Sequence, residues 1–190
     1  MRGAILQSSP LTRPSATLSP LRGARALTAA ALLLVSGCAT IPRISDPCAL
    51  LTPAGIRTVQ GEEPTQTTAS EQKSGELLFH QCFYTLPTFA KSISLGVGVG
   101  AREADAPREF WREMFHENKK EEGEEESHTP PRPVPNLGRE AYWIPLRIGA
   151  TLYVLDRNAM LRVSVGGNDS DAVRLEKSVA LARDVLARLR

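Results

Sequence analysis

The chain has 190 residues, of which 42% are hydrophobic, and a formal net charge of +2 at pH 7. This length suits one domain of ordinary size. Four arginines lie in the first 25 residues, and without them 19 basic residues face 21 acidic ones, a formal charge of −2. Without its first 25 residues the chain is nearly neutral and has no stripe of basic residues. It therefore lacks the charge pattern of a nucleic-acid-binding protein.

The first 37 residues end in the pattern of an export signal. Two arginines precede an apolar run, residues 26–35, and the small residues Ser36 and Gly37 follow it. The apolar run is shorter than the ~20 residues that span a bilayer. A basic flank, a short apolar core and small residues before a cut site are typical of a secretory signal. We therefore expect residues 1–37 to be a signal peptide.

A cysteine follows these small residues directly. Val35-Ser36-Gly37-Cys38 resembles the lipobox of bacterial lipoproteins, in which the thiol receives a diacylglyceryl group and becomes the first mature residue. The resemblance implies that Cys38 is the lipidation site, that residues 38–45 are a tether, and that the protein is anchored to a membrane of the cell envelope. Ala39, rather than Asp, resembles the sorting pattern for the outer membrane where the host has two membranes. A signal peptide with a chance cysteine is the alternative.

Two of the three cysteines remain once Cys38 carries a lipid. In an oxidising compartment an even pair forms a bridge, so we predict a Cys48–Cys82 disulfide. Redox activity is disfavoured because the spacing is far from Cys-x-x-Cys. A metal site would need His80 and His116 to converge on the cysteines without any supporting motif, so we expect no metal and no cofactor.

A short helix and a loop are predicted at the start of the mature chain. In residues 46–61, Thr52 can cap a helix, Pro53 fits the first helical position, and Gly61 suits a left-handed stop. Residues 62–75 are polar, with almost nothing apolar, which predicts a mobile loop.

Two antiparallel strands are predicted next, at residues 77–86 and 91–100. In the second, branched apolar residues alternate with serine and glycine, so one face of the strand is apolar and the other carries small residues. Gly96 and Gly98 on that face would let a backbone or a ligand approach the sheet. A dinucleotide-binding loop is disfavoured because no helix opens directly after these glycines.

An aromatic helix is predicted from Asp105 to about Lys120. Its stripe of Phe110, Trp111, Met114 and Phe115 is typical of a core-facing side, and if exposed it would form a groove wall. The acidic and proline-rich residues 119–135 predict a mobile loop. Weak cation binding is the alternative for its acidic residues and histidine, Glu121, Glu122, Glu124, Glu125, Glu126 and His128.

The last third predicts three strands, at residues 142–145, 151–155 and 160–165, and then a C-terminal helix. Together these elements predict that residues 46–190 form a single α+β domain. We expect an antiparallel sheet of about five strands with helices packed on it, in a two-layer or three-layer sandwich. The helices are expected on one face. The other face is then a candidate ligand groove, with Gly96, Gly98, Trp111 and Trp143 as its candidate residues.

Several short motifs resemble a lipoprotein family known as domain of unknown function 3558, which is frequent in actinobacterial envelopes. They are the lipobox cysteine, Asp46 to Pro53, Cys82-Phe83-Tyr84, Tyr142-Trp143 and the hairpin from Leu152 to Val165. The resemblance implies a sandwich similar to that of the oxygen-evolving lumenal proteins of photosystem II. The chain departs from the family at Gly55, where relatives have an acidic residue, and in the insertion after residue 117.

The sequence has no nucleophile motif and no histidine pair with zinc-ligand spacing, so we expect no enzyme. The preferred hypothesis is a non-catalytic, membrane-anchored module that binds an envelope protein or an apolar ligand such as a lipid. The alternatives are a small envelope hydrolase that uses His80 and Tyr84, and a structural subunit of an envelope assembly.

Overall fold

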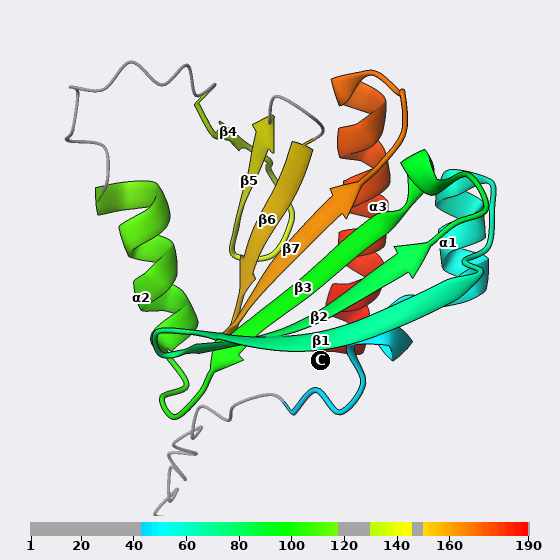
Figure 1. The fold of residues 1–190 in the computed structure, drawn as a ribbon. Coiled ribbons are helices and arrows are strands. Elements are labelled where there is room, and N and C mark those ends of the chain that lie inside the picture. The colour runs from blue at the N-terminus through cyan, green and yellow to red at the C-terminus, as the bar shows by residue number, and fades with distance from the viewer. Residues whose placement is uncertain (1–42, 118–129, 146–149, 190) are drawn as a thin grey trace, which may run out of the picture. The chain divides into compact units, whose positions relative to one another are not determined.

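The structure is a computed structural model that describes residues 43–117, 130–145 and 150–189, all within one compact unit. The predicted signal peptide, Cys38 and the first residues of the tether lie outside the described residues. The described part is α+β, and its strands form one antiparallel sheet (Figure 1). The sheet order is β1-β2-β3-β7-β6-β5-β4.

The described part of the chain contains the following helical segments and strands. The helical segments are η1 (Pro47–Leu50), α1 (Pro53–Gln60), η2 (Phe89–Lys91), α2 (Ala106–Arg112), the π-helical η3 (Glu113–Glu117) and α3 (Asp171–Arg188). The strands are β1 (Gln66–Ser74), β2 (Leu77–Thr85), β3 (Ile93–Gly100), β4 (Arg132–Pro133), β5 (Glu140–Pro145), β6 (Ala150–Asp156) and β7 (Ala159–Val165).

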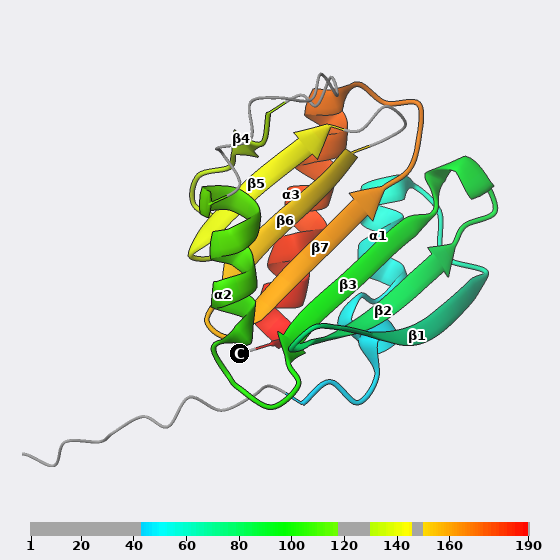
Figure 2. The same ribbon diagram turned by 60° about the vertical axis from the view of Figure 1, so that its left-hand side comes forward.

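The main core lies between the sheet and helices α1 and α3, on what we call the inner face. The alternation in β3 places its branched residues here, and Ile93, Leu95 and Val97 are fully buried. They meet an apolar side of α3 that includes Leu181 and Val185. Figure 2 shows α3 behind the sheet in this arrangement. The predicted apolar face of β3 is thus confirmed.

A second, smaller core lies on the opposite face, which we call the outer face. Here α2 packs over β3, β6 and β7, in front of the sheet in Figure 2. Trp111 and Phe115 pack against Leu155 and Met160. The described elements therefore form three layers where α2 lies, and the expectation that helices cover one face only is wrong. The aromatic stripe of α2 packs against the outer face, because α1 and α3 already cover the inner face.

The described residues contain seven strands, two more than the expected five. One addition is β1, which lies in the stretch 62–75 that was expected to be a loop. All nine of its residues are exposed, so the strand has no buried face and no alternating pattern to reveal it. The other is the two-residue β4, inside the expected loop 119–135. Residues 119–129 lie outside the described residues, whereas β4 pairs with β5 at the sheet edge, a position that tolerates Pro133.

The predicted helix caps are confirmed. The Thr52 hydroxyl accepts a hydrogen bond from the Gly55 amide at 3.1 Å, and Pro53 occupies the first turn. Gly61 ends α1 with a φ of 78°, in the left-handed region that glycine tolerates. The predicted helix from Asp105 is α-helical only to Arg112 and continues as the π-helical turn of η3.

Candidate functional site

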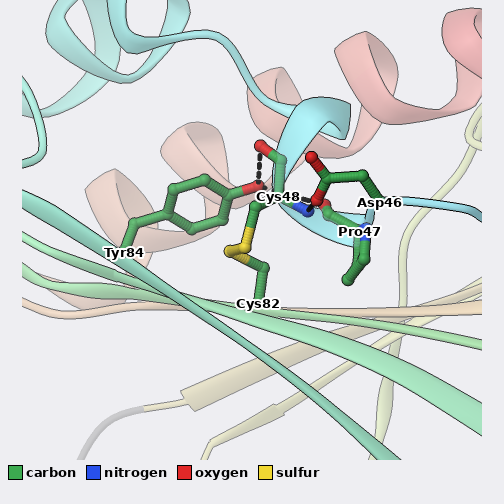
Figure 3. The surroundings of a disulfide bond; sticks show 5 residues. All are labelled: Asp46, Pro47, Cys48, Cys82 and Tyr84. Carbon is green, nitrogen blue, oxygen red and sulfur yellow. Dashed lines mark hydrogen bonds between the residues drawn. A yellow bond between two sulfur atoms is a disulfide. The ribbon is translucent and has the colours of Figure 1, made fainter.

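The predicted Cys48–Cys82 disulfide is present, and it joins η1 to strand β2 (Figure 3). The Tyr84 hydroxyl lies beside it and is positioned to donate to the carbonyl oxygens of Pro47 and Cys48, at 3.3 and 3.2 Å. Burial of the phenol raises the pKa of Tyr84 to about 12, because an apolar surrounding disfavours the phenolate. The Asp46 carboxylate accepts from the Cys48 amide at 2.8 Å. This cluster fixes the start of the domain against the sheet.

The two residues of the hydrolase alternative have different partners. His80 Nδ1 lies 3.3 Å from Glu71 Oε2 on β1, whereas the Tyr84 hydroxyl contacts main-chain carbonyls of η1. Both lie on one face of β2, but four residues apart in a strand is about 13 Å. In the described part of the chain no hydrogen bond joins them, and the Tyr84 ring is 1% exposed. This geometry does not form the single pocket that such a hydrolase requires.

The outer face combines small residues with very little charge. In the strand register, Ser94, Gly96 and Gly98 of β3 lie opposite Ser164, Arg162 and Met160 of β7. The next strand continues these rows with Thr151, Tyr153 and Leu155. Among the strand residues that the structure describes, Arg162 and Glu140 are the charged residues of this face.

Glu140 is compensated by groups on the helix above it. Its Oε2 accepts a hydrogen bond from Trp111 Nε1 at 3.0 Å and lies 2.9 Å from His116 Nε2. The Trp111 indole is the main cause that lowers the pKa of Glu140 below 4.5, and the His116 ring adds to it. A π-helical turn relates residues i and i+5, which is the spacing of Trp111 and His116. The cluster thus links α2 and η3 to β5.

Among the residues that the structure describes, Arg162 has no such compensation. Its side chain lies over Gly96, where a Cβ would be 3.6 Å from Nε of the guanidinium. No described carboxylate lies within 4 Å of its nitrogens. Arg162 is half-buried in the central region of the sheet, between its strand neighbours Gly96 and Tyr153. It is therefore a cation on the outer face that is available to an anion.

Two hollows open on the outer face. The first has a volume of about 180 Å³ and lies between α2 and the sheet, lined by Phe79, Phe110, Met114, Met160 and Tyr153 with Arg162, Gln72, Gln81 and Ser74. The second has a volume of about 520 Å³ and lies one row further along the strands, where Ser94, Thr151 and Ser164 are part of its lining. Phe83 also lines the second hollow, and its ring lies 6.2 Å from the exposed ring of Phe89.

The four predicted groove residues do not form one surface. Gly96 and Gly98 lie on the outer face, and Trp111 is buried beneath α2 on that side. Trp143 lies in the inner core and is fully buried, because its place opposite Leu152 in the register turns it toward α3. Trp143 is thus not part of the groove, and Trp111 supports the groove rather than lining it.

Sequence reasoning missed the strand residues that shape the first hollow, although it named Phe110 and Met114 as a groove wall if exposed. Arg162 carried a signal, since it is a lone charge within the apolar strand MLRVSV, and a charge in a central strand must point to an open face. Phe79 and Met160 carried none, because an apolar residue at the edge of a cavity has the same pattern as one inside a core.

A search of protein-family models finds no match to the chain, and a search of curated proteins finds no significantly similar sequence. The resemblance to the domain of unknown function 3558 stays a prediction that depends on the short motifs quoted above. None of the helices in the described residues is long and apolar enough to cross a membrane. Within the same residues, no cluster of three or more His, Cys, Asp or Glu side chains is arranged to hold a metal ion.

Proposed function

We propose that the protein is a lipid-anchored, non-catalytic binding module of a bacterial cell envelope, and that it binds an envelope component on the outer face of its sheet. The observation that carries this proposal is the second hollow of the outer face. It has a volume of about 520 Å³, and small side chains form its floor. A volume of this size falls within the range of ligand sites.

Two further observations support the location. The segment before residue 38 has the pattern of an export signal followed by a lipobox. The Cys48–Cys82 bridge agrees with it, because structural disulfides persist in oxidising compartments and are rare in the cytosol. Anchoring through Cys38 would hold the domain at the membrane surface, at the outer membrane where the host has two membranes.

A structural subunit of an envelope assembly is a second candidate, favoured by the exposed aromatic pair beside this hollow. Phe89 is 71% and Phe83 37% exposed, and the two rings are neighbours. Exposed apolar side chains that adjoin a groove are typical of protein contact sites. Both candidates use the same region of the outer face, and they differ in whether the bound component is a protein.

Site-specific photo-cross-linking in intact cells tests the proposal. A photoreactive residue at Asn168, an exposed position that lines the second hollow, is expected to capture an envelope component. The same residue at Thr58, on the exposed side of α1, is the control and is expected to capture none. A protein adduct favours the structural subunit, and a small-molecule adduct identifies a ligand. Absence of any adduct specific to position 168 contradicts the proposal.

A further inference from the structure

The charge of Arg162 determines what the first hollow can accept. The polar side chains that share this hollow, those of Gln72, Gln81, Ser74 and Tyr153, are uncharged at neutral pH. A half-buried guanidinium with uncharged neighbours has lost part of its hydration and gains most from an anion. Hydrogen bonds to a charged group are stronger than those between neutral groups. One positive charge is balanced by one negative charge, which favours a monoanion over a phosphate monoester.

The rest of the hollow is apolar and narrow. Its floor is formed by Phe79 and Met160, and Phe110 and Met114 of the helical layer form a wall. Its volume of about 180 Å³ is close to that of a cavity of about 150 Å³ that holds one benzene molecule. A short hydrocarbon chain or one ring fits this space, whereas a diacyl lipid does not.

Two glycines give this hollow its shape. A Cβ at position 98 would lie 2.8 Å from Cε1 of Phe79, so the ring occupies the space of the missing side chain and lies low on the sheet. A Cβ at position 96 would touch the Arg162 side chain, which therefore rests on bare backbone. The small-residue face thus positions one apolar group and one cation side by side.

We propose that this hollow binds a short- or medium-chain carboxylate, with the carboxylate on the Arg162 guanidinium and the chain between Phe79, Phe110, Met114 and Met160. Arg and a carboxylate form two parallel hydrogen bonds, a pairing with defined geometry. Gln81 lines the same hollow, and its amide nitrogen, which donates to Gln72 Oε1 at 3.4 Å, has a second N–H that is able to donate to the ligand. This inference rests on the proposed function and names the ligand class at the outer face.

Calorimetric titration with octanoate tests the inference. The protein is the full chain carrying Cys38→Ser, so that no attached lipid competes, with its disulfide formed. Octanoate is expected to bind saturably, and its neutral analogue octanamide at least tenfold more weakly. Octyl phosphate is expected to bind no more tightly than octanoate. A tenfold change in affinity corresponds to about 1.4 kcal/mol.

Paired arginine variants assign the site. Arg162→Gln is expected to weaken octanoate binding at least tenfold and to leave octanamide binding unchanged. Arg183→Gln removes the same charge from an exposed position on α3, and is expected to change binding less than twofold. Comparison of the two ligands on the unaltered chain needs no variant, so the inference remains testable if Arg162→Gln does not fold.

Three results overturn the inference: no saturable octanoate binding, equal affinity for octanoate and octanamide, or equal effects of the two arginine variants. Tighter binding of octyl phosphate than of octanoate overturns the carboxylate class. If octanoate fails but cross-linking at Asn168 succeeds, the ligand class is wrong and the proposed function stands. If both fail, the outer face is not the binding surface.

Discussion

Gly96 and Gly98 share a face of β3 but differ in what fills the space of the missing side chain. Over Gly98 an aromatic ring of the second core lies closer than a methyl group allows, and over Gly96 the flexible stem of Arg162 lies at ordinary contact distance. The alternating glycines were expected to let a backbone or a ligand approach the sheet, whereas side chains of the protein itself lie over both of them.

The first prediction compares Gly98→Ala with Gly96→Ala. The added methyl at position 98 must displace the Phe79 ring, and overpacking of this kind costs about 1–3 kcal/mol. At position 96 it meets Arg162 Nε at 3.6 Å, so we expect a change below about 1 kcal/mol in the free energy of unfolding. Urea denaturation of both variants measures the difference, and equal losses would contradict this account of the outer face.

The contacts of the Tyr84 hydroxyl are a residue-level feature that the sequence motifs did not predict. The cysteine pair could be predicted from redox compartment and number, but nothing in the sequence revealed that the Tyr84 hydroxyl fastens η1 beside the bridge. The phenol is buried, and its pKa rises from 10.0 to about 12. Its stabilising effect is therefore complete below pH 10 and is lost as the pH rises toward 12.

The second prediction concerns this alkaline range. The native protein is expected to lose roughly 2–3 kcal/mol of stability between pH 10 and 12 through Tyr84, since one pKa unit corresponds to about 1.4 kcal/mol. Tyr84→Phe should lack this part of the loss and cost about 1–2 kcal/mol at pH 7. Denaturation at several pH values gives the free energy of unfolding of the native protein, Tyr84→Phe and a control, Tyr153→Phe. The control should lose as much stability between pH 10 and 12 as the native protein.

At the scale of elements, the position of α2 depends on a polar contact as well as on its aromatic stripe. The Glu140 carboxylate on β5 accepts a hydrogen bond from the Trp111 indole and lies beside the His116 ring. The Tyr142 ring stacks on the Phe115 ring, with 4.6 Å between the ring centroids. These contacts attach α2 and η3 to β5. The hollow that Arg162 lines shares two residues of this helical layer, so its width depends on the same attachment.

The third prediction tests that attachment by pH. Because the pKa of Glu140 is lowered below 4.5, the contribution of its carboxylate is present in full above pH 4.5 and is lost as the pH falls through the lower folded-state value. The thermal midpoint of the native protein should therefore fall more between pH 5 and 3 than that of Glu140→Gln. Glu109→Gln, an exposed position on α2, is the control and should follow the native curve. Parallel curves for all three proteins would exclude this role.

The elements differ in how far the sequence specifies them. Strand β3 was predictable because apolar residues alternate with serine and glycine along it, and α1 because its caps are chemical signals. Strand β1 has no buried side chain, so main-chain pairing with β2 places it, and pairing leaves no mark on residue type. The sequence did not predict on which face of the sheet α2 packs either. An apolar stripe indicates that one side of a helix is buried, but not which face of the sheet buries it.

At the scale of the whole molecule, the bridge and the predicted anchor lie close together in the chain. Cys48 lies ten positions after Cys38 in the chain, and the disulfide connects this entry to β2, the second strand in the sheet order. An extended chain spans at most ~3.3–3.6 Å per residue, so the bridge would lie within about 36 Å of a lipid on Cys38. A pull on such an anchor would act on the sheet through the bridge, and α1 would not have to bear it.

The fourth prediction is that Cys38 carries the lipid. Cells grown with labelled palmitate should yield a labelled protein in the membrane fraction, and Cys38→Ser should abolish the label and release the protein from the membrane. One acyl chain holds a protein only marginally, so the diacylglyceryl group is what makes the attachment stable. The double variant Cys48→Ala with Cys82→Ala is the control: it should keep the label while losing about 3–4 kcal/mol of stability with its loop closure. A labelled Cys38→Ser protein, or an unlabelled native one, would contradict lipidation at Cys38.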